Sequence, residues 1–414
     1  MTPAVGYTAM KDSGIPWIGE IPKSWDIVRG KNTITLLERP VNSSDDVITC
    51  FRDGEVTLRK NRREEGFTNS LKEIGYQGVN PGDLVVHGMD GFAGSIGISD
   101  SRGKASPVLN VLDSNQNKRY LMYYLRGMAY KDVFMALSTG IRVRSCDLRW
   151  NKLSVFPFLL PSLSEQSAIA AYLDTQCAKI DEIIAEVKAS IEDYKQWKAS
   201  IIYEAVTKGL DPNVEMKDSG IEWIGEIPKG WNTCRIKNAT INMDNLREPI
   251  SAENRENKLG LYDYYGASGV IDKIDSYNVD DTVLLIGEDG ANLKMRNLPL
   301  VYRASGKFWV NNHAHILKVS SNNCYGYIAY LLEAGDYTTY ITGSAQPKLS
   351  QFNLMRFPIV VPPISEQIVI EKHLDSICSK IDGLIWEKQS SITDLETYKK
   401  SLIYEVVTGK RRVC

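Results

Sequence analysis

Two long segments of the chain, about 162–210 and 363–410, carry apolar residues at alternating steps of three and four. Such spacing places the apolar side chains on one face of a helix and is typical of a coiled-coil seam. Because both stripes belong to one chain, the pattern predicts two long helices that pair with each other as an intramolecular coiled coil. The stripes are Leu173, Cys177, Ile180, Ile184, Val187 and Ile191 in the first helix, and Leu374, Cys378, Ile381, Ile385, Ile392 and Leu395 in the second.

The ends of these helices also have sequence signals. Pro161 stands before the first helix and Pro362-Pro363 before the second, and Ser164 and Ser365 are the predicted N-caps. Gly209 is predicted to end the first helix. The stripes are interrupted at Lys198 and at the equivalent Lys399, where a lysine can extend to solvent or fix the register of the pair.

The segments between the helices have a different pattern, with short apolar runs around glycine turns. Residues 82–99, 281–293 and 307–319 alternate in the way that strands do, and residues 120–128 and 325–335 are predicted short helices. The pattern predicts an α+β protein with two mixed α/β, β-rich modules separated by the two long helices.

The chain also repeats itself. Residues 10–25 read MKDSGIPWIGEIPKSW and residues 216–231 read MKDSGIEWIGEIPKGW, so 14 of 16 positions are identical. The entry to the first helix returns 201 positions later, whereas the modules themselves share little. We divide the chain into a first module (1–155), a first helical region (156–212), a second module (213–356) and a second helical region (357–414).

Composition narrows the class of protein. The 414 residues have a net charge of −2, so any contact with nucleic acid has to come from local groups of basic side chains. The sequence has no apolar run of the length that a membrane span needs and no signal-peptide pattern. Its seven cysteines are scattered, without a C-x-x-C pair. We expect a cytoplasmic protein with reduced thiols and no membrane contact.

A search for catalytic motifs finds none. The phosphate-binding loop, the nucleophile elbow and the Asp/Asn-Pro-Pro-aromatic tetrad of adenine methyltransferases are all missing. His313 and His315 are two residues apart and would share a strand face. Because no third ligand is nearby, we interpret them as polar residues of a binding surface and predict no metal. The sequence therefore indicates a chain without catalytic residues.

Contact with DNA is the better-supported chemistry. Basic and amide side chains in loops that follow glycine can reach phosphates or form bidentate contacts with base edges. The candidate DNA-binding residues are Lys60, Arg62, Arg63, Arg142, Arg144, Tyr265, Asn292, Lys294, Arg296, His313, Gln346 and Lys348.

The whole arrangement resembles the specificity (S) subunit of type I restriction–modification enzymes. The matching features are the WIGEIPKxW opening in both copies, the Pro-x-x-Ser-Glu-Gln entry to each helix (Pro161 to Gln166 and Pro362 to Gln367), the heptad helices and the TGSAQPKL stretch at 342–349. The resemblance implies two target-recognition domains, each reading one half of a bipartite asymmetric site on double-stranded DNA. It also implies that the two helices pair as an antiparallel coiled coil and set the unread spacer between the halves.

The same resemblance implies partners. Two methyltransferase (M) subunits would supply S-adenosylmethionine chemistry, and restriction (R) subunits would supply ATP- and Mg-dependent translocation and cleavage, so this chain would bind no cofactor. Two other interpretations stay open at this point. One is a non-catalytic coiled-coil scaffold that binds only proteins, and the other is a single-chain DNA methyltransferase or nuclease.

Overall fold

The computed structural model describes residues 7–62, 73–137 and 148–413. Three candidate contact residues, Arg63, Arg142 and Arg144, lie outside the described residues. The chain forms two compact units, Met1–Lys188 with Gln389–Cys414, and Ala189–Lys388. Among the described residues, no helix has the length and apolar character needed to cross a membrane.

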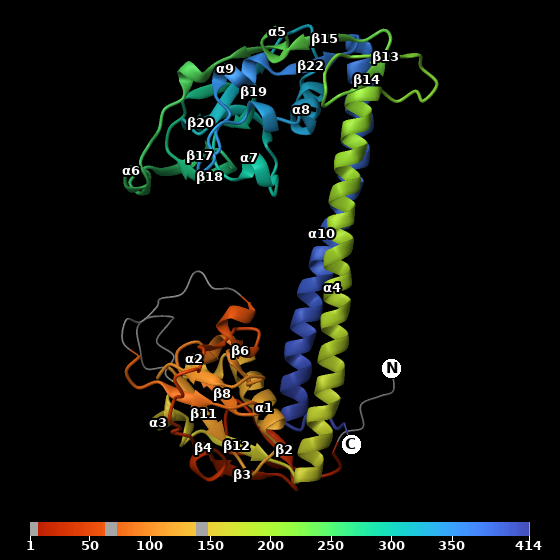
Figure 1. Ribbon diagram of the computed structural model, residues 1–414. Coiled ribbons are helices and arrows are strands. Elements are labelled where there is room, and N and C mark those ends of the chain that lie inside the picture. Colours follow the sequence, from red (N-terminus) through yellow and green to blue (C-terminus); the bar gives the residue numbers. More distant parts are fainter. Residues whose placement is uncertain (1–6, 63–72, 138–147, 414) are drawn as a thin grey trace. The chain divides into compact units, whose positions relative to one another are not determined.

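Two long helices are shared between the units. α4 spans Leu163–Lys208 and α10 spans Ile364–Val407, and each helix continues from one unit into the other. Within each unit, part of α4 runs beside part of α10 in the opposite direction (Figure 1). The predicted α+β class with an antiparallel helix pair is therefore confirmed.

The predicted seam residues fall into two groups by burial. Most are buried, and the rest, near the middle of the helices and in the second half of α10, are half-buried. The buried ones are Leu173, Cys177, Ile180, Ile184, Ile191, Leu374, Cys378 and Ile381, and the half-buried ones are Val187, Ile385, Ile392 and Leu395.

The two lysines that interrupt the stripes form equivalent ion pairs. In the first unit Lys399 Nζ lies 2.6 Å from Asp181 Oδ2, and in the second unit Lys198 Nζ lies 2.7 Å from Asp382 Oδ1. Partly exposed pairs of this kind contribute up to about 1 kcal/mol each. Burial of the apolar stripe therefore provides most of the stability of the helix pair, and the lysines select its register.

The predicted N-caps are wrong by two residues. α4 begins at Leu163, and its first turn is capped by Ser162, whose Oγ accepts a hydrogen bond from Glu165 N at 3.3 Å. α10 begins directly after Pro363. Ser164 and Ser365 already lie in the first turn of each helix, because the helices begin within two residues of Pro161 and Pro363. Gly209 follows the last residue of α4 with a φ of +77°, as the sequence predicts.

The first module is built on small antiparallel sheets. Two of its two-stranded pairs join β1 (Met10–Asp12) to β2 (Glu20–Pro22) and β3 (Asp26–Arg29) to β12 (Pro157–Leu160). Its largest sheet has four strands in the order β4-β11-β8-β9, and its helices include α1, which packs on this sheet. The remaining elements are β4 (Thr35–Leu36), β5 (Ile48–Cys50), β6 (Val56–Leu58), β7 (Gln77–Val79), β8 (Leu84–His87), β9 (Ile96–Ile98), β10 (Gly103–Ala105), β11 (Leu109–Asp113), α1 (Lys118–Tyr130), α2 (Val133–Ala136) and α3 (Trp150–Leu153).

The second module repeats the pairs but not the large sheet. β13 (Met216–Asp218) pairs with β14 (Glu226–Pro228), and β15 (Asn232–Arg235) with β22 (Pro358–Val361). Its large sheet has six strands in the order β16-β21-β19-β20-β17-β18, with only β17 and β20 parallel. Its other elements are β16 (Thr240–Asn242), β17 (Leu259–Gly266), β18 (Gly269–Ile274), β19 (Val279–Gly287), β20 (Val301–Val310), β21 (Ala314–Val319), α5 (Ile236–Ala239), α6 (Ala252–Glu256), α7 (Asn292–Met295), α8 (Tyr325–Ala334) and α9 (Gln351–Arg356).

The repeated sequence motifs make the same contacts in both units. Trp25 Nε1 donates to Glu165 Oε1 at 3.2 Å, and Trp231 Nε1 donates to Glu366 Oε2 at 2.9 Å. The glutamines that follow these glutamates repeat as well. Gln166 accepts from the backbone N–H before α1 at 3.0 Å, and Gln367 accepts from the one before α8 at 2.8 Å. The motifs thus join each module to the start of its own long helix.

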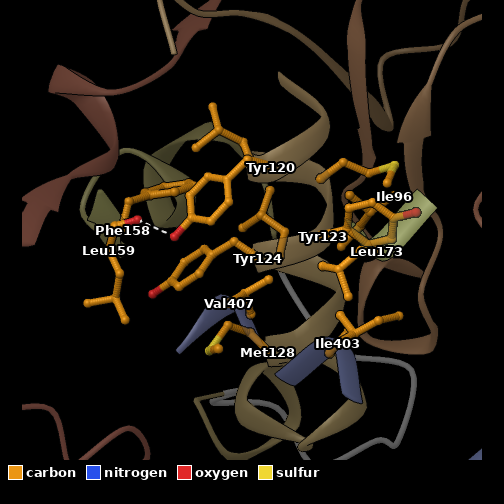
Figure 2. Close-up of a cluster of buried hydrophobic side chains, with 14 of the residues drawn as sticks. Ile96, Tyr120, Tyr123, Tyr124, Met128, Phe158, Leu159, Leu173, Ile403 and Val407 are labelled. Carbon is orange, nitrogen blue, oxygen red and sulfur yellow. Dashed lines mark hydrogen bonds between the residues drawn. The ribbon is translucent and has the colours of Figure 1, made fainter. Parts of the chain in front are cut away.

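The core of the first unit lies where α1 meets the helix pair (Figure 2). Tyr120 and Tyr124 of α1 are buried between β12 and the last turns of α10, where Ile403 and Val407 lie. The Tyr120 hydroxyl donates to the Leu159 carbonyl at 2.8 Å, which satisfies its only polar group. α1 therefore carries the contact between the sheet and the long helices.

The helix pair should be sensitive to cavities at its ends. Leu374 is completely buried in the core of the second unit, so Leu374→Ala should lower the free energy of unfolding by about 2–5 kcal/mol. Trp386, on the same helix, is 71% exposed, and Trp386→Ala should change it by less than about 0.5 kcal/mol. Thermal unfolding of the two variants, side by side, measures the difference. Equal destabilisation would contradict this description of the core.

Candidate nucleic-acid interface

A loop of the second module is held against the turn that follows β19. Thr342 and Lys348 exchange two backbone hydrogen bonds of 2.8 Å each, which close the loop, and Gly343 turns it with a φ of +82°. Gly290 N donates to the Pro347 carbonyl at 3.1 Å, and this bond joins the loop to the turn. Gln346 lies in the loop with its side chain exposed. The loop is thus a fixed platform for polar side chains.

A network of charged side chains lies beneath this loop. Glu288, which directly follows β19, accepts from Arg247 and from Lys348, whose Nζ lies 3.0 Å from it. Asp244 accepts from His315 Nδ1 at 2.7 Å and from the backbone N–H of Ile316 at 2.8 Å. His315 Nε2 lies 2.8 Å from the Leu349 carbonyl, so both ring nitrogens face acceptors.

Burial makes this network important for stability. Asp244 and Glu288 expose 6% and 9% of their side chains, and His315 exposes none. Burial alone would raise the pKa of Asp244, but the hydrogen bonds from His315 and from Ile316 N outweigh it and lower the pKa. The pKa of Glu288 is likewise lowered, because hydrogen bonds from Arg247 and Lys348 outweigh burial. Loss of one partner from such a group leaves a buried charge without compensation.

These pKa shifts predict an acid-sensitive module. A carboxylate whose pKa falls on folding adds stability above its unfolded pKa and loses it as the pH falls through the folded value. The ordinary values here are 3.8 for Asp244 and 4.5 for Glu288, so the contribution should be complete above pH 4.5 and disappear below it. Melting temperatures measured from pH 6 to pH 3 should therefore fall less steeply for Glu288→Gln than for the unchanged chain. Parallel curves would contradict the network.

Three candidate residues are brought together around the loop. Lys348 and Gln346 lie on it, and His313 Nδ1 lies 2.8 Å from Asp289, whose backbone bridges to Lys348. The expectation that His313 and His315 share a strand face is wrong, because His313 lies in the turn before β21 while His315 is buried within that strand. Their rings have different carboxylate partners.

The other candidates of the second module lie elsewhere in it. Asn292 and the exposed Lys294 are on α7, and the Asn292 amide bonds to the backbone of Leu298. Arg296 ends α7 with a φ of +52° and bonds to Glu333, lining a cleft of about 880 Å³. Tyr265 on β17 is half-buried against Phe308, with ring centroids 5.5 Å apart. The predicted strand at 281–293 ends at Gly287, because the following residues form the turn and α7.

The described candidates of the first module lie near one short turn. Lys60 Nζ lies 2.5 Å from Asp46, and Arg62 lies 2.7 Å from Asp53 while its guanidinium stacks 4.1 Å from the centre of the Phe51 ring. These ion pairs are partly exposed, and each contributes up to about 1 kcal/mol. A phosphate group could therefore replace the carboxylates at little cost.

The sequence pattern missed Asp244, Arg247 and Glu288. Two signals could have found them: the Asp-x-x-Arg spacing in a polar stretch, and a glutamate that directly follows the apolar run of β19. Both are weak signals in a sequence with 24% charged residues. The network becomes recognisable only when the strand ends and the 342–349 loop are seen together.

Comparison with known proteins gives consistent matches. The family model for the type I restriction modification DNA specificity domain matches residues 228–393. A putative type I restriction enzyme specificity subunit of Haemophilus influenzae, S.HindORF215P, is 33% identical over 137 residues, which cover 33% of this chain and 34% of that protein. The chain thus matches only about a third of the length of that relative.

Two further matches extend over nearly the whole chain. The StySPI specificity subunit of Salmonella potsdam is 19% identical over 431 residues and covers 95% of this chain and 90% of that protein. A structure solved in a study of complex assembly and conformational transition of the type I restriction–modification system has a TM-score of 0.69. It is 13% identical in sequence and covers 94% of this chain and 98% of its own, so it supports the fold.

The fold and these matches define a class of protein, that of chains carrying type I DNA specificity domains. Both units repeat one frame, which consists of the opening hairpin, the strand pair beside it and the entry to a long helix. This repeated frame, which carries two modules, and the helix pair that runs through both units agree with that class. Residues 228–393 match the DNA specificity domain of type I restriction modification systems, and nearly the whole chain is similar to specificity subunits of type I restriction enzymes.

Proposed function

We propose that this chain selects the DNA sequence on which a type I restriction–modification complex acts. Each module would read one half of a bipartite asymmetric site, and the helix pair would set the number of unread base pairs between the halves. Methyltransferase and restriction subunits in the cytoplasm would carry out the chemistry with S-adenosylmethionine, Mg and ATP, and this chain would hold no cofactor and no catalytic residue.

One observation carries the proposal: the two units share a frame but differ in their large sheets. The Trp–Glu and glutamine contacts at the helix entries recur almost atom for atom. The large sheet of the described residues, in contrast, has four strands in one module and six in the other. A repeated frame with unlike modules is suited to an asymmetric site, because equivalent mounting leaves each module free to read a different sequence.

The loop platform of the second module supports direct reading of bases. Glutamine and lysine side chains can make bidentate or charge-assisted contacts to base edges in the major groove. Gln346 and Lys348 are exposed on a loop whose backbone is fixed at both ends. A loop that is ordered before binding loses less entropy when it meets DNA, which favours specificity.

The competing function is a scaffold that binds only proteins through the helix pair. Selection of DNA fragments from a random pool, by the chain purified with a methyltransferase subunit of a type I enzyme, separates the two functions. Our proposal expects enrichment of two unlike short sequences at a fixed distance, with Gln346→Ala relaxing only one of them. Absence of any enriched sequence would favour the scaffold.

A further inference from the structure

Although the two large sheets differ in size, four of their strands follow the same order. β4, β11, β8 and β9 are neighbours in the first module, and β16, β21, β19 and β20 are neighbours in the second. Every neighbouring pair in both series is antiparallel. β8 therefore corresponds to β19. We call residues 87–90 the β8 turn and residues 287–290 the β19 turn, against which the loop platform of the second module is held.

The backbone of the β8 turn makes the same hydrogen bonds as that of the β19 turn. Gly88 N donates to the carbonyl directly before β11 at 2.7 Å, and Glu288 N donates to the carbonyl directly before β21 at 2.9 Å. The Gly88 carbonyl accepts from Leu148 N at 2.8 Å, and the Glu288 carbonyl accepts from Leu349 N at 2.7 Å. Leu148 and Leu349 are 201 positions apart, which is also the displacement of the helix entries. The two turns are therefore equivalent residue by residue.

A buried polar side chain supports each turn from below. Asn110 Nδ2 donates to the Leu148 carbonyl at 3.0 Å, and His315 Nε2 lies 2.8 Å from the Leu349 carbonyl. Asn110 is the second residue of β11 and His315 the second residue of β21, and both are buried. Because an amide and an imidazole make the same bond, the supported backbone is what the two modules share. The structure that holds the reading loop of the second module thus recurs in the first.

The β8 turn is fixed by a histidine, where the β19 turn has a charged network. His87 Nδ1 accepts hydrogen bonds from the backbone N–H groups of Met89 and Asp90 at 3.2 and 2.9 Å. Burial lowers the pKa of His87, which favours the neutral ring that such bonds require. Gly88 stands where the second module has Glu288, the centre of its network. The turns share a backbone but differ in chemistry, as two modules that read different sequences require.

Two exposed side chains lie at the β8 turn. Met89 is 53% exposed although it is apolar. Arg52, from the turn between β5 and β6, exposes 60% of its side chain, and its guanidinium lies 3.1 Å from Asp90 Oδ1. This ion pair holds the guanidinium beside Met89. Because a guanidinium has several N–H donors, the bond to Asp90 leaves others for a ligand.

We propose that Arg52 and Met89 read bases in the half-site of the first module. The inference rests on the proposed function, which supplies that half-site. Arg52 donates to O6 and N7 of a guanine in the major groove, and Met89 packs on the methyl group of a thymine close to it. Lys60 and Arg62, which lie on a different turn, contact phosphates and carry no sequence preference.

Selection of DNA from a random pool tests these assignments. The chain is purified with a methyltransferase subunit of a type I enzyme, and the enriched sequences are compared for the unchanged chain, Arg52→Lys and Met89→Ala. Arg52→Lys keeps the charge but loses the bidentate geometry, so preference for one G·C pair should fall about five- to hundredfold. Met89→Ala should weaken preference for one T·A pair about fourfold. Both changes should fall in the half-site that also changes when residues 26–150 are exchanged.

The matched controls are Arg29→Lys and Val155→Ala. Both side chains are exposed in the same unit and lie outside the β8 turn, so these variants should enrich the unchanged motif. Circular dichroism of each variant confirms that it is folded.

The outcomes separate the two proposals. If the unchanged chain enriches no sequence, the proposed function fails. If it enriches a bipartite motif and both variants enrich the same motif equally strongly, the function stands and the assignment of Arg52 and Met89 is wrong. An equal loss of affinity for every sequence would show contact with phosphates alone. A changed preference in the other half-site would place the β8 turn in the wrong module. Either of these results overturns the inference.

Discussion

Replacing residues 26–150 with the aligned segment of another specificity subunit should change one half of the recognised DNA sequence and leave the other half unchanged. The reason is that this segment holds the four-stranded sheet and its loops, whereas the opening hairpin and the helices stay as they are. The first joint falls at the start of β3, which is exchanged with the segment, while its partner β12 stays in place, so the equivalent strand of the donor has to pair with β12. The StySPI relative is a suitable donor, since its alignment covers 95% of this chain.

The size of this effect should be large. A mismatched base pair costs about 1–3 kcal/mol of binding free energy in specific complexes. The chimaera should therefore no longer bind the original half-site in the presence of all the other sites of the genome. Sequencing of methylated adenines in cells that carry the chimaera and the methyltransferase measures the outcome. The reciprocal exchange of residues 232–356 is the control and should alter the opposite half. A chimaera that changes both halves, or neither, would show that the modules do not read independently.

The second large effect is expected from lengthening both long helices. Seven residues inserted after Lys188 in α4 and after Lys388 in α10 add one heptad at the boundary between the units, so the contacts inside each unit are kept. At about 1.5 Å per residue the helices gain about 10 Å, which corresponds to roughly three base pairs of duplex. The unread spacer should therefore lengthen by about three base pairs while both half-sequences stay the same.

Insertion into only one helix is the matched control. It would shift the register, so that Lys198 no longer meets Asp382 or Lys399 no longer meets Asp181, and the seam would be mispaired in one unit. We expect the single insertions to lower the melting temperature and abolish methylation. If the double insertion leaves the spacer unchanged, the helices do not measure the distance between the half-sites.

Much of the frame was predictable because it depends on local and periodic signals. The spacing of Leu173, Cys177 and Ile180 specifies a helix face whatever the rest of the chain does. The same spacing occurs a second time in the same chain, which predicts that the two helices pair with each other. The lysines at 198 and 399 were recognised as interruptions, but their carboxylate partners are on the other helix and could not be read from the stripe alone.

The candidate site was less predictable because it is made by residues far apart in sequence. Asp244, Glu288, His315 and Lys348 come from four separate segments, and only the order of strands in the six-stranded sheet brings them together. The pattern also treated His315 as an accessible strand residue, whereas it is buried. Alternation predicts that a side chain faces one side of a sheet but does not say which side is covered.

The central claim is that two unlike modules on one repeated frame read two unlike halves of a DNA site. Genome-wide mapping of N6-methyladenine, in cells that express this chain with a methyltransferase subunit of a type I enzyme, tests the claim most directly. We expect one asymmetric motif with two different short sequences separated by a fixed number of unread base pairs. A continuous motif, a palindrome, or methylation that does not depend on this chain would contradict it.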